Sequence, residues 1–137
     1  MQVSKVTCTE TPTRFLTVIE DDPDIQLLVE TIFSMDSRFS AANATETAEE
    51  ALESAQKTAP GIIVLDHGLA GSLTGLDAAP LLKELAPRAK IILFTAHAEL
   101  QTRATAESAI DAFLLKTDPT RLLPMAQRLT GLDAQPT

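Results

Sequence analysis

The segment FLTVIEDDPDIQLLV, residues 15–29, passes from an apolar run through an acidic turn into a second apolar pattern with helical spacing. Residues 15–19 are almost continuously hydrophobic, which is typical of a strand with both faces buried. Pro23 suits the first turn of a helix, where its missing N–H would have no partner. Hydrophobic residues then recur on one helix face: Ile25, Leu28, Val29, Ile32 and Phe33. The segment predicts a buried strand, an acidic turn and a helix.

The same unit recurs along the chain. Four more strand-like runs, with amphipathic stretches between them, occupy residues 38–43, 61–65, 90–94 and 112–116. Alternating strands and helices indicate an α/β fold, and continuous apolar runs favour parallel strands covered by helices on both faces. Right-handed crossovers favour an open, doubly wound, flavodoxin-like sheet, for which we expect the strand order 2-1-3-4-5. We predict one domain at residues 15–130, between tails at 1–14 and 131–137.

Caps and prolines predict where the central helices begin. The stretch TETAEEALESAQKTA, residues 45–59, has Thr45 as a candidate cap, acids in its first turns and a lysine near its end. This distribution of charge matches the helix dipole. Another helix is expected to start near Asp77, because that start places Pro80 in the first turn, where proline is tolerated.

The last helix has two alternative starts. With Asp118 as its cap and Pro119 as its first residue, Pro124 would fall in the helix interior and kink it. Alternatively, the helix starts late, near Leu123. The pattern leaves both alternatives open.

The chain of 137 residues is acidic, with a net charge of −8 and a pI of about 4.6. Nucleic-acid binding depends on clustered Lys and Arg, which this sequence lacks, so we expect no nucleic-acid partner. No apolar run approaches the ~20 residues that a membrane helix needs, so we expect no membrane partner. The single cysteine, Cys8, lies in a polar N-terminal segment without a partner for an internal disulfide. These features favour a cytoplasmic location.

Polar residues follow the predicted strands at the end where such sheets bind ligands, beyond the carboxyl ends of the strands. Glu20 and Asp21 follow the first strand, Asp66 the third and Thr95 the fourth, while Lys116 ends the fifth. Because the site lies at the switch point between the first and third strands, we expect these side chains to converge. They would form one cluster of three carboxylates, one hydroxyl and one ammonium group.

The charges of this cluster predict a metal ion. Two carboxylates at ~4 Å repel each other by a few kcal/mol at an effective dielectric constant near 20. Lys116 can neutralise part of the negative charge, and a divalent cation can neutralise the rest. Oxygen ligands without Cys or His favour Mg²⁺, for which Mn²⁺ could substitute.

Four motifs carry a resemblance to a known family. They are the acidic pair in VIEDDPDI, the Asp that ends IIVLD, the hydroxyl in FTAHA and the Lys in AFLLKTD. In this order, on successive strands, they resemble the receiver domains of two-component response regulators. The likeness spans roughly residues 15–130. It implies a cytoplasmic bacterial signalling protein that accepts a phosphoryl group from a sensor histidine kinase or a histidine phosphotransfer protein.

The resemblance also implies roles for individual residues. Asp66 would be the phosphoacceptor, and Mg²⁺ would be held by Glu20, Asp21, Asp66 and the backbone carbonyl of Gly68. Such a protein is not an enzyme in the usual sense, because it assists only its own aspartyl phosphorylation and dephosphorylation.

Thr95 and Lys116 would contact the phosphoryl group. Thr95 and Phe113 would then form a switch, in which the hydroxyl moves inward and the aromatic ring enters the space it leaves. The switch would change a protein-interaction surface made by the fourth helix, the fifth strand and the fifth helix, where an unknown downstream protein binds.

The sequence departs from the family pattern in two loops. In DHGLAGSLTG, residues 66–75, Ala70 replaces the usual proline and Gly75 comes one place late, which suggests a one-residue insertion. After Lys116 the family often has a proline with a cis peptide bond, but here Thr117 follows. We expect a trans bond, because a cis non-prolyl bond costs ~3–4 kcal/mol.

Three alternatives remain at this point. A haloacid-dehalogenase-like, Mg²⁺-dependent phosphohydrolase would use Asp22 and Asp24 as its paired acids, although its motif then fails; otherwise these two residues serve only the turn and the helix start. A degenerate receiver would act only as a binding module. The chain could also be the input part of a longer regulator.

Overall fold

The structure is a computed structural model that describes residues 13–132, so most of the two predicted tails, with Cys8, lies outside the described residues. The strands are β1 (Arg14–Ile19), β2 (Phe39–Thr45), β3 (Ile62–Leu65), β4 (Lys90–Thr95) and β5 (Ala112–Leu115). The helices are α2 (Pro23–Phe33), α3 (Ala48–Thr58), α4 (Gly75–Leu85), α5 (Gln101–Ala106) and α6 (Leu122–Leu129). Short 3₁₀ helices, η1 (Ala98–Leu100) and η2 (Pro119–Arg121), precede α5 and α6. Among the described residues, no helix combines the length and hydrophobicity needed to cross a membrane.

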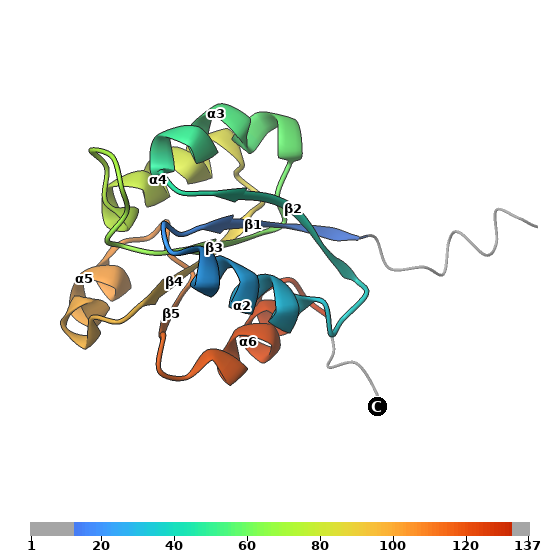
Figure 1. Cartoon of the computed structure of the whole chain (residues 1–137). Helices are drawn as coiled ribbons and strands as arrows, with labels where there is room; N and C mark the ends of the chain where they lie inside the picture. Colours follow the sequence, from blue (N-terminus) through green and yellow to red (C-terminus); the bar gives the residue numbers. More distant parts are fainter. Residues whose placement is uncertain (1–12, 133–137) are drawn as a thin grey trace, which may run out of the picture.

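The five strands form one parallel sheet in the order β2-β1-β3-β4-β5, which confirms the predicted fold class and topology. In Figure 1, α3 and α4 lie on one side of the sheet, and α2 and α6 lie on the other. The chain therefore builds three layers, and every strand points its carboxyl end toward the same edge.

Each face of the sheet has its own hydrophobic core. One core joins alternate residues of the central strands to alanines of α3 and to Leu76, Leu82 and Ala104 from α4 and α5. The other joins the opposite residues of the strands to Val29 and Phe33 of α2 and to α6. Because both faces are covered, β3 is buried at every position, as its continuous apolar run predicted.

The strand β2 lies at the edge of the sheet and differs from the prediction. Only its first and last residues, Phe39 and Thr45, are buried, so its sequence carries a weak apolar signal. The strand extends to Thr45, and Thr47 caps α3 by accepting a hydrogen bond from the backbone N–H of Glu50. The prediction that Thr45 is the cap was therefore wrong by two residues.

The helix α2 begins at Pro23 as predicted, but its buried face is narrower than predicted. Val29, Ile32 and Phe33 are buried, whereas Leu28 keeps 37% of its surface exposed. Leu28 was therefore placed wrongly on the core face.

The helix α4 starts earlier than predicted. Thr74 accepts a hydrogen bond from the N–H of Asp77, and the Asp77 side chain accepts one from the N–H of Thr74. This capping box places the first helical residue at Gly75, so Pro80 lies inside the helix and not in its first turn. The capping box therefore sets the first residue of α4, although proline is better tolerated in the first turn of a helix.

The start of the last helix follows the second alternative. The 3₁₀ helix η2 (Pro119–Arg121) comes first, and α6 begins at Leu122, next to the predicted Leu123. Pro124 is then the third residue of α6, where it does not interrupt the helix interior.

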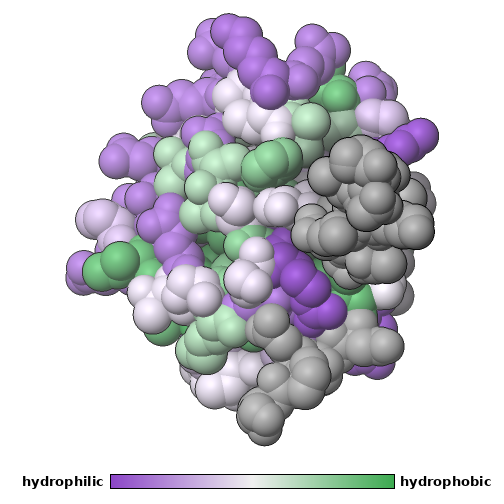
Figure 2. Space-filling view, turned by 90° about the vertical axis from the view of Figure 1, so that its right-hand side faces the viewer, coloured by the Kyte–Doolittle hydropathy of each residue, from purple (hydrophilic) through white to green (hydrophobic). Residues whose placement is uncertain are grey.

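A buried ionic cluster lies at the amino ends of the strands, between α2, β2 and α6. Asp36 is fully buried and accepts hydrogen bonds from Nε and Nη2 of Arg38 at 2.9 and 2.7 Å and from Nε2 of Gln127 at 3.0 Å. These hydrogen bonds, above all those from Arg38, hold the pKa of Asp36 well below its usual range. Figure 2 shows this end of the molecule, where hydrophobic and hydrophilic residues are interspersed on the surface.

Candidate functional site

The register of the sheet brings the predicted acidic residues together. Ile19, the last residue of β1, pairs with Leu65, the last residue of β3. Glu20 and Asp66, which follow directly, therefore lie side by side at the edge of the sheet. The N–H of Asp66 donates to the carbonyl of Ile19 at 3.0 Å, which fixes this juxtaposition. Both residues are buried, with 3% and 7% of their surface exposed.

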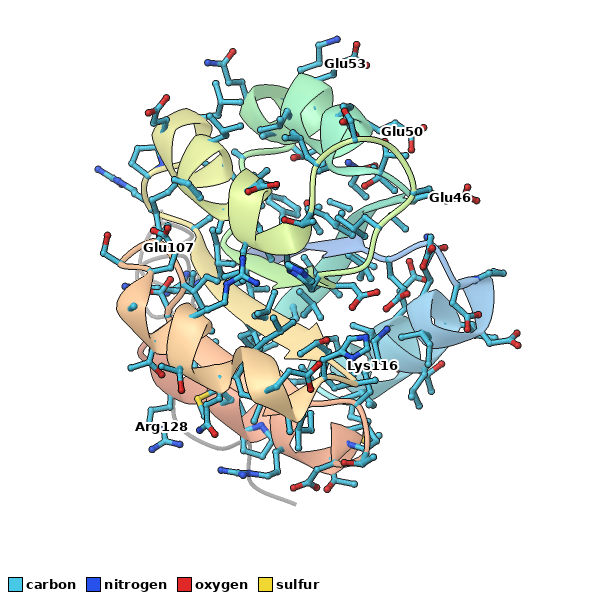
Figure 3. The ribbon with its side chains drawn as sticks, turned by 90° about the vertical axis from the view of Figure 1, so that its left-hand side faces the viewer. Glu46, Glu50, Glu53, Glu107, Lys116 and Arg128 are labelled. Carbon is cyan, nitrogen blue, oxygen red and sulfur yellow. The ribbon has the colours of Figure 1, made fainter. Side chains whose placement is uncertain are left out.

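Lys116 connects these two carboxylates. Its Nζ lies 2.8 Å from Oε1 of Glu20 and 3.1 Å from Oδ2 of Asp66. Figure 3 shows the molecule from this side, with Lys116 near the middle of the view, where the strands end. One ammonium group therefore bridges residues that follow β1 and β3 from a position directly after β5.

The acidic cluster has three members. Ligand oxygens of Glu20, Asp21 and Asp66 lie within 4.8 Å of one another, and Asp21 is the exposed member. All the donors are carboxylate oxygens, the set that hard divalent cations prefer. The prediction that these residues come together is correct, and the cluster could hold a metal ion.

Burial and neighbouring charges together shift the pKa values of the site. Burial raises the pKa of the Glu20 carboxyl to about 7; the hydrogen bond from Lys116 opposes this increase, and the charge of Asp66 adds to it. Burial alone would lower the pKa of Lys116, but hydrogen bonds and charges from Glu20 and Asp66 outweigh it and raise that pKa. A single ammonium group thus does not fully compensate the neighbouring carboxylates.

Thr95 ends β4 beside the last residue of β5. It pairs with Leu115, and its carbonyl accepts a hydrogen bond from the N–H of Lys116 at 2.8 Å. Thr95 is fully buried, and its hydroxyl oxygen accepts a hydrogen bond from the N–H of His97 at 3.2 Å. The hydroxyl and the ammonium group therefore come from neighbouring strand ends.

The loop after Asp66 and the first turn of α4 pack closely against this residue. Oδ1 of Asp66 accepts a hydrogen bond from the N–H of His67 at 2.8 Å. A Cβ atom at Gly75 would collide with the backbone carbonyl of Asp66, so the first turn of α4 packs directly on the strand end. Gly68 is exposed between these two contacts. Position 75 therefore requires glycine, the residue that the sequence analysis found one place later than in the family pattern.

Two other acids of the opening segment have a structural role. Oδ1 of Asp22 accepts a hydrogen bond from the N–H of Asp24 at 2.9 Å and caps α2. This confirms the interpretation that Asp22 and Asp24 serve the turn and the helix start. The peptide bond between Lys116 and Thr117 is trans, as expected, because residues 13–132 contain no cis bond.

Phe113 lies on β5, three residues before Lys116, and is only partly buried. It lines two hollows of about 210 and 160 Å³, one beside Ala104 and Thr105 of α5 and one beside Gln101 and Arg121. The aromatic ring therefore contacts open space at the surface formed by α5, β5 and η2.

Two residues near the site were missed or left aside by the sequence analysis. Nδ1 of His67 is buried without a hydrogen-bond partner among the described residues, and burial, with the nearby charge of Arg103, lowers the pKa of His67. Glu49 of α3 binds Ser72 in the loop after Asp66, across 23 residues of sequence. No local pattern signals such a contact, because its partners meet only in the folded chain.

Comparisons with known proteins identify the family of this chain. The model of the response regulator receiver domain matches residues 16–127. No curated protein sequence matches significantly.

Solved structures share the fold at low sequence identity. The response regulator domain of Thermotoga maritima CheB is 17% identical, with a TM-score of 0.76, and the match covers 88% of this chain and 98% of that one. A LuxR-family response regulator from Aurantimonas is 23% identical, with a TM-score of 0.76 and coverage of 90% and 89%. The response regulator TrrA from Thermotoga maritima, solved in complex with Mg²⁺-BeF, is 24% identical, with a TM-score of 0.75 and coverage of 85% and 99%. These likenesses show the fold, and the matched family model, which spans most of the chain, shows that this protein belongs to the response regulator receiver domain family.

Proposed function

We propose that Asp66 accepts a phosphoryl group from the phosphohistidine of a sensor kinase or a histidine phosphotransfer protein. The observation that carries this proposal is the position of Lys116, whose Nζ bridges Glu20 and Asp66 at 2.8 and 3.1 Å inside a three-carboxylate cluster. Such a site neutralises only part of the charge of its own acids, so a cation would complete the compensation. The protein changes its own covalent state and is therefore a phosphoacceptor more than a turnover enzyme.

The chemistry requires little beyond positioning and charge neutralisation. A carboxylate oxygen of Asp66 forms a bond to phosphorus, the P–N bond of the phosphohistidine breaks, and its electron pair returns to the imidazole. Glu20, Asp21 and Asp66, with the carbonyl of Gly68, would hold Mg²⁺, which supplies positive charge beside the phosphoryl oxygens. Lys116, whose Nζ lies 3.1 Å from Oδ2 of Asp66, supplies a second positive charge.

The output of the reaction is a changed protein surface. Thr95 is buried at the end of β4, and Phe113 borders two hollows beside α5 and η2. In our proposal, the phosphoryl group attracts the Thr95 hydroxyl, and the Phe113 ring moves into the space that it leaves. The surface of α5, β5 and α6, which are the fourth helix, fifth strand and fifth helix of the sequence analysis, then binds a downstream protein.

The charge and composition of the chain support a proposal for its kind of partner and its location in the cell. A net charge of −8 supports protein partners and not nucleic acid, and we place the reaction in the cytoplasm. Residues 15–130 form the receiver unit in this proposal.

Intact-mass spectrometry with acetyl phosphate and Mg²⁺ tests the assignment of Asp66. We expect one added phosphoryl group in the wild type, none in Asp66→Asn, none after chelation of Mg²⁺ and slower addition in Lys116→Ala. No adduct on the wild type under any condition would contradict the proposal and favour a degenerate receiver.

Asp22→Asn is the matched control. Asparagine retains the capping oxygen, so this variant should fold and accept phosphate like the wild type. A phosphohydrolase of the haloacid dehalogenase type would instead lose its activity in Asp22→Asn and keep it in Asp66→Asn.

A further inference from the structure

The loop of residues 67–74, between Asp66 and α4, is attached to a neighbouring helix by one carboxylate. Oε2 of Glu49, in the first turn of α3, accepts hydrogen bonds from the Ser72 hydroxyl at 2.8 Å and from the N–H groups of Ser72 and Leu73, each at 3.2 Å. Three donors on two consecutive residues thus converge on one charged oxygen. Hydrogen bonds to a charged acceptor are stronger than those between neutral groups.

The backbone of the loop is shaped for this carboxylate. Gly71 has φ of +91°, which favours glycine, and it directs the N–H groups that follow toward α3. A Cβ atom on Gly71 would lie 2.6 Å from Oε1 of Glu49, and this oxygen is buried without a hydrogen bond among the described residues. A larger residue at position 71 would therefore both strain the backbone and push the carboxylate away.

The contact is continuous with the segment next to Asp66. Ala70 forms a parallel β-bridge with Thr47, the cap of α3, directly before Gly71. On the other side, the carbonyl of His67 accepts hydrogen bonds from the N–H groups of Leu69 and Gly75, at 3.1 and 3.0 Å. Gly68 lies between these two attachments, so its backbone position depends on both.

We propose that Glu49 is a positioning residue, which fixes the loop after Asp66 and thereby holds the Gly68 carbonyl where it can bind Mg²⁺. This inference rests on the proposed function of the acidic cluster and deepens it. Glu49 also accounts for the two departures in this loop. In this proposal, the hydrogen bonds to Glu49 supply the constraint that these departures remove: Ala70 stands where the family usually has a proline, and Gly75 comes one place late.

The test compares Glu49→Ala and Glu49→Gln with Glu53→Ala. Glu53 lies one turn further along α3, is exposed, and points away from the loop (Figure 3). The first measurement is amide hydrogen exchange of residues 68–73 by NMR in the metal-free protein. We expect faster exchange at Ser72 and Leu73 in Glu49→Ala, an intermediate increase in Glu49→Gln, and no change in Glu53→Ala.

The second measurement is the Kd for Mg²⁺ by calorimetric titration. Removing a residue that orients a metal ligand typically weakens binding by 10- to 100-fold, so we expect a Kd about 10-fold higher in Glu49→Ala. Glu49→Gln keeps an acceptor oxygen but loses its charge, and its Kd should rise by roughly 3-fold.

The outcomes separate this inference from the proposed function. If the wild type binds Mg²⁺ and the Glu49 variants bind it equally well, the role of Glu49 is overturned and the function of Asp66 stands. Unchanged exchange at Ser72 and Leu73 overturns the contact itself. If the wild type binds no Mg²⁺, the metal site fails and this inference fails with it. Gly71→Ala should repeat the effect of Glu49→Ala, which keeps the test valid if the latter variant does not fold.

Discussion

Buried carboxylates occupy both ends of the sheet, and their surroundings differ. At the amino end, Asp36 is enclosed by the guanidinium of Arg38 and the amide of Gln127, and its pKa lies below the usual range. At the carboxyl end, Glu20 and Asp66 share the single ammonium group of Lys116, and burial raises the pKa of Glu20 to about 7. The protein itself balances the negative charge at the amino end, whereas the negative charge at the carboxyl end is only partly balanced.

This difference separates a structural ion pair from a candidate metal site. A buried charge is stable when opposite charge and hydrogen bonds compensate its lost hydration. Asp36 meets this condition within the chain. The cluster of Glu20, Asp21 and Asp66 does not, so we expect a bound cation to lower its free energy. The following predictions test this contrast, from the largest expected effect to the smallest.

Asp36→Ala should lower the free energy of unfolding by about 3 kcal/mol, because it removes the buried acceptor of the Gln127 amide and the carboxylate that the Arg38 guanidinium binds. Urea unfolding followed by circular dichroism measures the change, since the chain has no Trp or Tyr for fluorescence. Asp24→Ala, at an exposed helix start, is the control and should cost no more than about 1 kcal/mol. Equal losses in the two variants would contradict the assigned role of Asp36.

Mg²⁺ should stabilise the protein through the carboxyl end alone. At a free concentration of 100 times Kd, a ligand that binds only the folded state raises the free energy of unfolding by about 2.7 kcal/mol. We expect this increase at pH 7.5 in the wild type and in Asp36→Asn, and a much smaller one in Asp66→Asn. Urea unfolding with and without Mg²⁺ gives the comparison, and an equal increase in all three proteins would refute a specific site.

The two ends should respond to pH with opposite sign in metal-free buffer. Glu20 has a folded pKa of about 7, above its usual 4.5, so the folded state binds the proton more tightly. The free energy of unfolding should therefore fall as the pH rises from 4.5 to 7, by on the order of 2 kcal/mol. The pKa of Asp36 is lowered below 3.8, so its stabilising contribution is present above that pH and lost as the pH falls through the folded value.

Glu20→Gln is the control for this pH dependence. It should flatten the slope between pH 4.5 and 7 while leaving the acid limb, which depends on Asp36, unchanged. A slope in this range that persists in Glu20→Gln would show that other groups cause it.

Asp66→Asn should stabilise the metal-free protein slightly, by about 1 kcal/mol at pH 8, because it removes repulsion from Glu20 and keeps the side-chain shape. The same substitution should lower the pKa of Glu20, which NMR titration of its carboxyl carbon can follow. A loss of stability would instead indicate that Lys116 fully balances both acids.

Features that depend on a short stretch of sequence were predicted most accurately. Four strands were located within about a residue, because a strand buried on both faces must be apolar along its length. The edge strand β2 has a largely exposed pattern, and this led to the wrong cap at Thr45. The start of α4 depended on the reciprocal hydrogen bonds of Thr74 and Asp77, whose strength outweighed the preference of Pro80.

The order of the chemical groups along the chain was sufficient to predict the cluster of Glu20, Asp21, Asp66 and Lys116. Each follows an apolar run, and parallel strands bring their carboxyl ends to one edge.

The sequence by itself determined the alternation of strands and helices and the residue types that gather at the strand ends, because both depend on short-range patterns and on connection rules. Only the tertiary structure decided how charges are balanced, since that depends on which side chains approach across long separations. The approach of Gln127 to Asp36, 91 residues away, completes one ion pair. The approach of Glu49 to the loop at Ser72 has no local pattern either, because hydrogen bonds between distant segments leave no periodicity in the sequence.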